Sequence, residues 1–279
     1  MKNADLHTHS IYSDGRMTPT QVVAIAKKRK VKYLALADHN STQGLVEAIR
    51  ECKKARITLI PSVEISAAED DLLGHNIDYK NKKFQKELLD IRKRYENDIK
   101  RTIASVNTLG FKLKHSDLLK KFSPATNMMK SHIARYLCEK LNMDYQEVRK
   151  KYLSHDSKYY IPVKKISIIK AIQIVKNAGG TPTLAHPWVE PESRALLKEK
   201  TFKKLVDAGL KGIEIDNGDR DSRRTPQILA KIRTLAKKYR LIITSGSDFH
   251  GSYLAKISPH HDLGKSNCDE KIAKFLLKY

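Results

Sequence analysis

The amino-acid sequence predicts an α/β protein, either an α/β barrel or a doubly wound sheet. Two observations carry this prediction: short β-rich apolar runs recur along the chain, and helical segments with recognisable starts separate them. A third observation adds to it, because the alternation stops between Tyr79 and about Lys165, where only helical patterns remain. The sequence therefore predicts strands and helices in alternation, interrupted by a helical insertion.

Seven segments have the pattern of strands. In chain order they are ADLHT (4–8), YLALAD (33–38), LIPSVEI (59–65), GHNIDY (74–79), TPTLAH (181–186), GIEIDN (212–217) and LIITSGSD (241–248). Several are nearly continuous apolar runs, which are typical of parallel strands covered by helices. We therefore expect a parallel sheet.

The connecting helices are indicated by their ends. In the segment 18–30, Thr18 is the expected N-cap and Pro19 occupies the first helical position. The segments 41–55 and 225–239 are similar, the latter with Thr225 and Pro226. Lysine and arginine crowd the last turns, where a positive charge favours the helix dipole.

The interruption is a basic helical region. One long helix is expected over 84–110 and shorter helices over 131–141 and 144–153. Residues 80–165 contain 22 Lys and Arg against 9 Asp and Glu, a net charge of +13. More than half of the chain's excess positive charge thus lies in this region.

Composition restricts the functional class. The formal net charge of the 279 residues is +23, which favours polyanionic partners, although a general lysine bias would give the same value. No apolar run of membrane-spanning length occurs, and the first ten residues lack the apolar core of a signal peptide. The three cysteines, scattered at 52, 138 and 268, suit a reducing compartment. We expect a cytoplasmic protein with no membrane association.

Histidines and acids gather at the predicted strand ends. His7 and His9 lie on the same face of the first strand, because strand side chains alternate. The carboxyl ends of parallel barrel strands form one face, and neutral imidazole is a common ligand for transition metals. Six histidines and three acids are expected at that face: His7, His9, Asp14, His39, Glu64, His75, His186, Asp248 and His250. Each alone could be structural, but together they predict a metal site with several ions.

These residues resemble the PHP (polymerase and histidinol phosphatase) family of metal-dependent phosphoesterases. The segments DLHTHS, SDG, ADHN, PSVEIS, GH, AHP and SGSDFHG stand in the family's order. The resemblance implies a distorted seven-stranded β/α barrel formed by residues 1–79 and about 166–279. Residues 80–165 are then a helical insertion domain over the active site.

The resemblance also implies a trinuclear centre. His7, His9, Glu64 and Asp248 are the implied ligands of one metal, and Glu64 bridges to a second that also takes His75 and His186. Asp14, His39 and His250 hold the third. The ions are expected to be Mn, Fe or Zn, since nitrogen and oxygen ligands accommodate all three. Glu64, Asp248 and His186 are the expected catalytic residues.

The insertion indicates a branch of the family. Its position after the strand with His75 is similar to that in nucleoside 3′,5′-bisphosphate phosphatases and 5′→3′ exonucleases that act on RNA or short oligonucleotides. That branch often carries a Gly-Arg-Pro-His-like motif, which here reads MKSHIARYL. Lys130, His132 and Arg135 are therefore the expected substrate-binding residues, although lysine lacks the bidentate geometry of arginine.

The expected reaction is hydrolysis of a nucleotide phosphate ester by a hydroxide that bridges two metals. Three alternatives remain: a small-molecule phosphatase of the histidinol phosphatase type, an amidohydrolase, and a nucleic-acid-binding protein with structural metals. Asp14, Glu64 and the Asp-x-His ending at Asp248 speak against an amidohydrolase. The sequence leaves the oligomeric state open.

Overall fold

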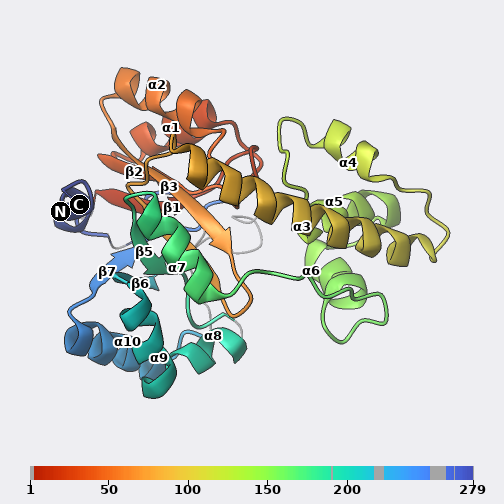
Figure 1. Ribbon diagram of the computed structural model, residues 1–279. Coiled ribbons are helices and arrows are strands. Elements are labelled where there is room, and N and C mark those ends of the chain that lie inside the picture. The colour runs from red at the N-terminus through yellow and green to blue at the C-terminus, as the bar shows by residue number, and fades with distance from the viewer. Residues whose placement is uncertain (1–2, 190, 217–222, 252–261, 267, 279) are drawn as a thin grey trace.

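The protein is a seven-stranded barrel with a helical lobe attached to one side (Figure 1). The computed structural model describes residues 3–189, 191–216, 223–251, 262–266 and 268–278. The strands are β1 (Ala4–Thr8), β2 (Tyr33–Leu36), β3 (Thr58–Ser66), β4 (Asp71–His75), β5 (Thr181–Leu184), β6 (Gly212–Asp216) and β7 (Ile242–Ser245). They are hydrogen-bonded in chain order, and a bridge between Thr8 and Phe249 brings the chain after β7 beside β1. The predicted α/β barrel is confirmed. Asn217, the expected last residue of the sixth strand, lies outside the described residues.

The expectation of a wholly parallel sheet is wrong at β4. This strand runs antiparallel to both β3 and β5 and begins earlier than expected, at Asp71 instead of residue 74. Only residues 67–70 separate β3 from β4. A parallel connection needs about a dozen residues, so this short link forces the chain to turn back. As a result, the amino end of β4 lies at the edge of the barrel where the other strands end.

Helices cover the outside of the barrel, as the sequence predicts. They are α1 (Pro19–Lys28), α2 (Leu45–Ala55), α7 (Ile168–Asn177), α8 (Pro191–Leu196), α9 (Glu199–Ala208), α10 (Pro226–Tyr239) and α12 (Glu270–Leu276). The side chains of Thr18 and Thr225 accept hydrogen bonds from the backbone N–H groups of Gln21 and Ile228, so both expected N-caps are confirmed.

Residues 80–165 include the helical lobe, and their elements are all helices. These are α3 (Lys82–Asn107), α4 (His115–Lys121), α5 (Lys130–Leu141), α6 (Tyr145–Val148) and η1 (Arg149–Leu153). Helix α3 belongs to two hydrophobic cores. Its first half contributes Phe84 and Leu88 to the barrel core, and its second half contributes Ile99 and Ile103 to the core of the lobe. Figure 1 shows α3 extending from the barrel into the lobe.

The reversal of β4 changes how the lobe reaches the strand ends. The chain leaves β4 after His75, at the end of the barrel opposite to that edge, so the lobe does not begin directly over the site. Helix α3, about 39 Å long, carries the chain back along the barrel. Arg92, in its middle, donates a hydrogen bond to the carbonyl oxygen of Asn40, beside the strand-end face. None of the described helices is long and apolar enough to cross a membrane.

Candidate metal centre

The first group of ligand atoms lies inside the mouth of the barrel. It consists of His7 and His9 on β1, Glu64 on β3 and Asp248 after β7. The Nε2 atoms of His7 and His9 lie 3.2 and 3.3 Å from Glu64 Oε2, and 3.5 and 3.2 Å from Asp248 Oδ1. Both imidazoles and Glu64 are completely buried. Two nitrogens and two carboxylate oxygens therefore face one point.

The second group shares His9 and includes Asp14, His39 and His250. Asp14 Oδ1 lies 3.3 Å from His250 Nε2 and 3.8 Å from His39 Nε2. The turn that presents Asp14 is fixed by Asp38, whose carboxylate accepts hydrogen bonds from the backbone N–H and hydroxyl of Ser10 and from the hydroxyl of Ser13. The chain around Asp14 is thus held in place before any ligand binds.

The third group joins His39 and Glu64 to Asp71, the first residue of β4. His186 adjoins it, with its Nε2 atom 3.1 Å from Glu64 Oε1. His186 and Asp248 have φ angles of +23° and +51°, which are uncommon for residues with a side chain. Strained backbone of this kind persists where the surrounding structure holds it, and it is common at functional sites.

His75 lies apart from these groups. It pairs with Ser62 and with Thr181, the first residue of β5, so it sits deeper in the barrel than Glu64. Its Nδ1 atom is 3.1 Å from Ser62 Oγ, and its Nε2 atom has no hydrogen-bond partner. Among the described residues, no group of ligand atoms contains His75. Sequence reasoning named His75 and did not consider Asp71, because it took the fourth strand to run parallel.

Opposite charges control the ionisation of these side chains. Burial alone would lower the pKa of His186, but the hydrogen bond to Glu64 and its charge raise that pKa to about 10. Burial likewise opposes ionisation of Asp14, yet His250 and His39 hold its pKa well below the ordinary value. Asp70, 3.9 Å from His186 Nδ1, behaves differently, because burial raises its pKa to about 8.

The donor set fits metal ions. Within the described residues, the buried atoms that lack a hydrogen bond include His7 Nε2, both ring nitrogens of His9, His39 Nδ1 and Glu64 Oε2. Buried polar atoms without a partner are costly, so their convergence calls for a ligand. With metal–ligand bonds of about 2.1 Å, ligand atoms around one ion lie roughly 3.0–3.4 Å apart. Most of the distances within the first group fall in or near that range.

A buried acid that sequence reasoning missed orients two of these histidines. Glu214 on β6 is completely buried, and its Oε1 atom accepts a hydrogen bond from His7 Nδ1 at 3.3 Å. Its Oε2 atom accepts the backbone N–H of His186 at 3.0 Å. With the proton on Nδ1, the lone pair of His7 Nε2 is directed at the first group. An acid inside the apolar strand GIEID was the available signal.

The lobe contacts the site through α5. His132 is completely buried: its Nδ1 atom accepts the backbone N–H of Met129, and Nε2–H donates to the carbonyl oxygen of Ser13 at 3.1 Å. Both nitrogens are used, so neither is free for a substrate phosphate. Arg135 Nη1 lies 3.5 Å from the carbonyl oxygen of Asp14. These contacts tie α5 to the turn that carries Asp14.

Lys130 occupies a different side of α5. Its Nζ atom lies 3.7 Å from the centre of the Tyr160 ring. Burial lowers the pKa of Lys130 to about 8, with a further contribution from the neighbouring Lys165. Lys165 in turn lies 3.4 Å from Asp71. Lys165 therefore lies between Lys130 of the lobe and Asp71 of the third ligand group.

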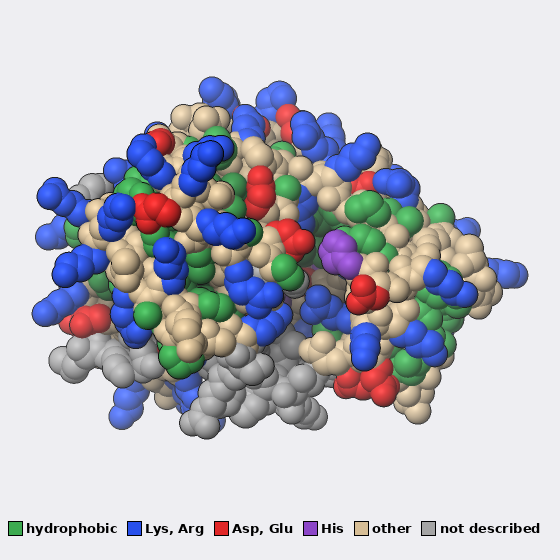
Figure 2. Space-filling model, turned by 90° about the horizontal axis from the view of Figure 1, so that it is seen from below, with side chains coloured by type: hydrophobic (Ala, Val, Ile, Leu, Met, Phe, Trp, Pro, Cys, Tyr) green, Lys and Arg blue, Asp and Glu red, His purple; other side chains and the backbone are tan. Residues whose placement is uncertain are grey.

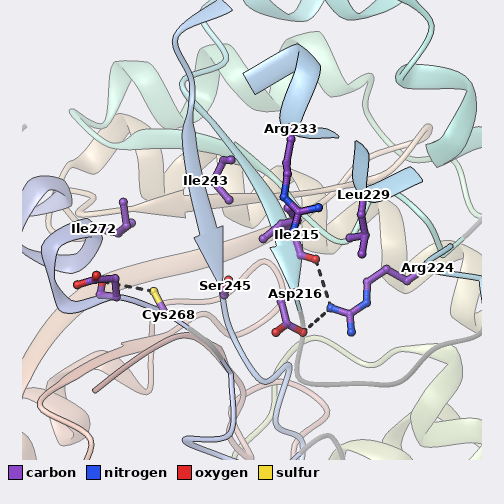
Figure 3. Close-up of a pocket in the computed structure, with 10 residues that line it drawn as sticks. Ile215, Asp216, Arg224, Leu229, Arg233, Ile243, Ser245, Cys268 and Ile272 are labelled. Atoms are coloured by element: carbon purple, nitrogen blue, oxygen red, sulfur yellow. Dashed lines mark hydrogen bonds and ion pairs between the residues drawn. The ribbon is translucent and has the colours of Figure 1, made fainter. Parts of the chain in front are cut away.

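A cavity elsewhere contains none of these groups. It measures about 470 Å³ and lies on the outside of β6 and β7, where Asp216 pairs with Arg224 (Figure 3). Leu229 and Arg233 of α10 and Ile272 of α12 complete its wall. Figure 2 shows Lys and Arg side chains scattered over the face that carries α8, α9 and α10, with no single continuous patch. Neither feature competes with the strand ends as the functional site.

Comparisons with known proteins agree with this geometry. The chain is 29% identical to a 3′,5′-nucleoside bisphosphate phosphatase of Chromobacterium violaceum, over 90% of this chain and 88% of that protein. It is 32% identical to a 5′-3′ exoribonuclease of Haemophilus influenzae, over 89% of this chain and 90% of the other. A crystal structure from Bifidobacterium adolescentis, described as a metal-dependent phosphoesterase, superposes with a TM-score of 0.86 at 28% identity and covers 99% of this chain and 95% of its own.

The family assignment comes from a match over more than half of the chain. The PHP domain family matches residues 5–169, which include β1 to β4 and the lobe. Together with the clustered histidines and acids, this match shows that the chain belongs to the PHP domain family and is a metal-dependent hydrolase of phosphate esters.

Proposed function

We propose that the substrate is a nucleotide phosphate ester, either a nucleoside 3′,5′-bisphosphate or the 5′ end of a short RNA. The names of the two relatives described above give a nucleoside bisphosphate and RNA as their substrates. In either substrate, a second phosphate or phosphodiester lies one nucleoside away from the scissile phosphate. The site should therefore offer cations at a distance from the metals.

The observation that carries this proposal is the position of Lys130. No ion pair joins it to any acid within the described chain, and its ammonium is half-buried beside Lys165. The charge of Asp98 only partly offsets burial and the repulsion by Lys165, so binding of an anion there would be favourable. Lys130 thus has the properties of a binding group for the second phosphate, with Arg135 beside Asp14 on the other side of α5.

We further propose that the three ligand groups hold three divalent ions, Mn, Fe or Zn. Bound metals supply an acidified water as nucleophile and neutralise the phosphoryl oxygens. The protein's own residues hold this arrangement: Glu214 fixes the ring of His7, and Asp38 fixes the turn of Asp14. We propose Glu64, which is shared by the first and third groups, and Asp248 and His186 beside it as the catalytic residues.

Phosphate release from adenosine 3′,5′-bisphosphate by the manganese-loaded protein tests the proposal, with AMP as the comparison. We expect rapid release from the bisphosphate and slow release from AMP. Lys130→Met should raise KM for the bisphosphate about 10- to 100-fold and leave AMP unaffected, because one charge-assisted phosphate contact is lost. Lys140→Met, on the exposed last turn of the same helix, is the matched control.

Short RNA is the second candidate, favoured by the net charge of +13 over residues 80–165. A substrate that contacts many phosphates loses affinity steeply as salt rises, whereas a mononucleotide does not. The slope of log KM against log salt concentration separates the two. A shallow slope for a 5′-labelled decamer would remove RNA as the preferred substrate.

Two other functions remain as outcomes of the same assay. Release from histidinol phosphate but from neither nucleotide would indicate a small-molecule phosphatase. No turnover of any ester by a fully metal-loaded protein that binds RNA would indicate a nucleic-acid-binding protein with structural metals.

A further inference from the structure

Asp71 occupies the position where the fold needs a ligand. On β3, Ser62, Glu64 and Ser66 share one face, and their partners on β4 are His75, Leu73 and Asp71. Asp71 and His75 therefore both lie on the face of Glu64, but four residues, or about 13 Å, apart. The reversal of β4 puts Asp71 at the strand-end edge and His75 towards the opposite end.

Neighbouring contacts fix Asp71 beside the metal groups. Its carbonyl oxygen accepts the backbone N–H of Ala185, the residue before His186. Its carboxylate forms a group with His39 and Glu64 whose ligand atoms all lie within 4.8 Å of one another. Two atoms of that group, His39 Nδ1 and Glu64 Oε2, are buried 3.2 Å apart and have no hydrogen bond, and Glu64 Oε2 also belongs to the first group. The orphaned nitrogen of His39, with His186 Nε2 3.1 Å from the other oxygen of Glu64, indicates that the group binds an ion and is not merely a cluster of acids.

We propose that Asp71, and not His75, is the ligand on β4 of a metal that Glu64 binds beside His39 and His186. The site then has two carboxylates in place of one carboxylate and an additional imidazole. Oxygen-rich sites favour Mn²⁺ over Zn²⁺, relative to sites rich in imidazole. This inference rests on the three-metal centre of the proposed function. It gives the third group, in which Asp71 and Glu64 join His39, the largest share of oxygen ligands among the three groups.

The competing explanation is that Asp71 serves only as the partner of Lys165, 3.4 Å away. The two explanations predict different effects of removing the lysine. A structural ion pair is lost equally by changing either partner, whereas a metal ligand is lost only by changing Asp71. Removing a cation near a metal site favours the metal, if it has any effect.

The test counts metals without using a substrate. Wild type, Asp71→Asn, His75→Asn and Lys165→Gln are stripped with chelator, reloaded with excess Mn²⁺, freed of unbound metal by gel filtration and analysed by mass spectrometry for Mn per chain. We expect Asp71→Asn to retain one ion fewer than wild type, and the other two variants to retain the wild-type number. Circular dichroism establishes that each variant is folded.

Three results would overturn the inference: an unchanged metal count in Asp71→Asn, the loss of an ion in His75→Asn instead, or the same loss in Lys165→Gln. If Asp71→Asn does not fold, Asp71→His is tested in its place, because the histidine can still bind a metal at this position. It should raise the preference for Zn²⁺ over Mn²⁺ at least about tenfold in a competition titration, and an unchanged preference contradicts the proposal. Full metal loading without phosphate release would sink the proposed substrate and leave the assignment of Asp71 intact.

Discussion

The ring of His132 and the carbonyl oxygen of Ser13 are joined by a hydrogen bond of 3.1 Å, although 119 residues separate them in the chain. This bond connects the first turn of α5 to the turn that ends in Asp14. Asn127 makes a similar connection, donating its side-chain N–H to the carbonyl oxygen of His39 at 3.1 Å. The lobe thus holds the backbone on both sides of the second ligand group.

The pH dependence of stability should reveal the buried His132. Burial lowers its pKa to about 4, against 6.5 for the free side chain. The unfolded chain therefore binds the extra proton first, and stability present above pH 6.5 is lost as pH falls towards 4. We expect His132 to contribute on the order of 3 kcal/mol to this loss. Urea unfolding of wild type and His132→Gln between pH 7 and 4 measures it, and parallel curves for the two proteins would disprove it.

Removing a ligand of the first group should abolish turnover and leave the fold. His9 belongs to two ligand groups, so His9→Ala should lower kcat by at least about 10²–10³-fold. Its ring lies among other imidazoles and carboxylates, outside the hydrophobic clusters of the described chain, so thermal unfolding should remain cooperative. His115→Ala, a change on α4 far from the ligand groups, is the control and should retain full activity.

The affinity for a second phosphate should depend on pH through Lys130. Its pKa of about 8 means that the side chain is charged at pH 7 and increasingly neutral above pH 8. KM for adenosine 3′,5′-bisphosphate should therefore rise between pH 7 and 9. Lys130→Arg, whose guanidinium stays charged, should show a flatter profile. Identical profiles for the two proteins would mean that Lys130 does not bind the phosphate.

Loss of charge at Glu214 should weaken metal binding without removing a ligand. Glu214→Gln keeps the shape of the side chain but no longer stabilises the proton on His7 Nδ1. Changes at such orienting groups typically cost 10- to 100-fold in metal affinity. Calorimetric titration of the stripped protein with Mn²⁺ measures the change. Asp216→Asn, on the same strand but facing the outer cavity, should bind metal like wild type.

The sequence predicts most of this architecture because its signals are local. Apolar runs and capped helices specify seven strands and their covering helices, and the Thr18 and Thr225 caps form as expected. Residues at the ends of parallel strands, such as His7 and Asp248, come together for the same topological reason. The direction of β4 was not predicted, since it depends on the length of the link at 67–70, and the choice between His75 and Asp71 follows from that direction. The acid in GIEID signals that Glu214 is buried, but its partner His7, like the partner Ser13 of His132, lies more than 100 residues away, so neither contact was predicted.

The sharing of α3 between the two cores determines where this enzyme could be re-engineered. Exchanging residues 80–165 for the corresponding region of a relative would replace Phe84 and Leu88 in the barrel core with side chains fitted to a different barrel. A graft that begins within α3, after Tyr95 and before Ile99, would keep all the α3 side chains of the barrel core. The exchangeable segment therefore begins in the middle of a helix. Hybrids that exchange substrate specificity by joining the two chains at this point should fold.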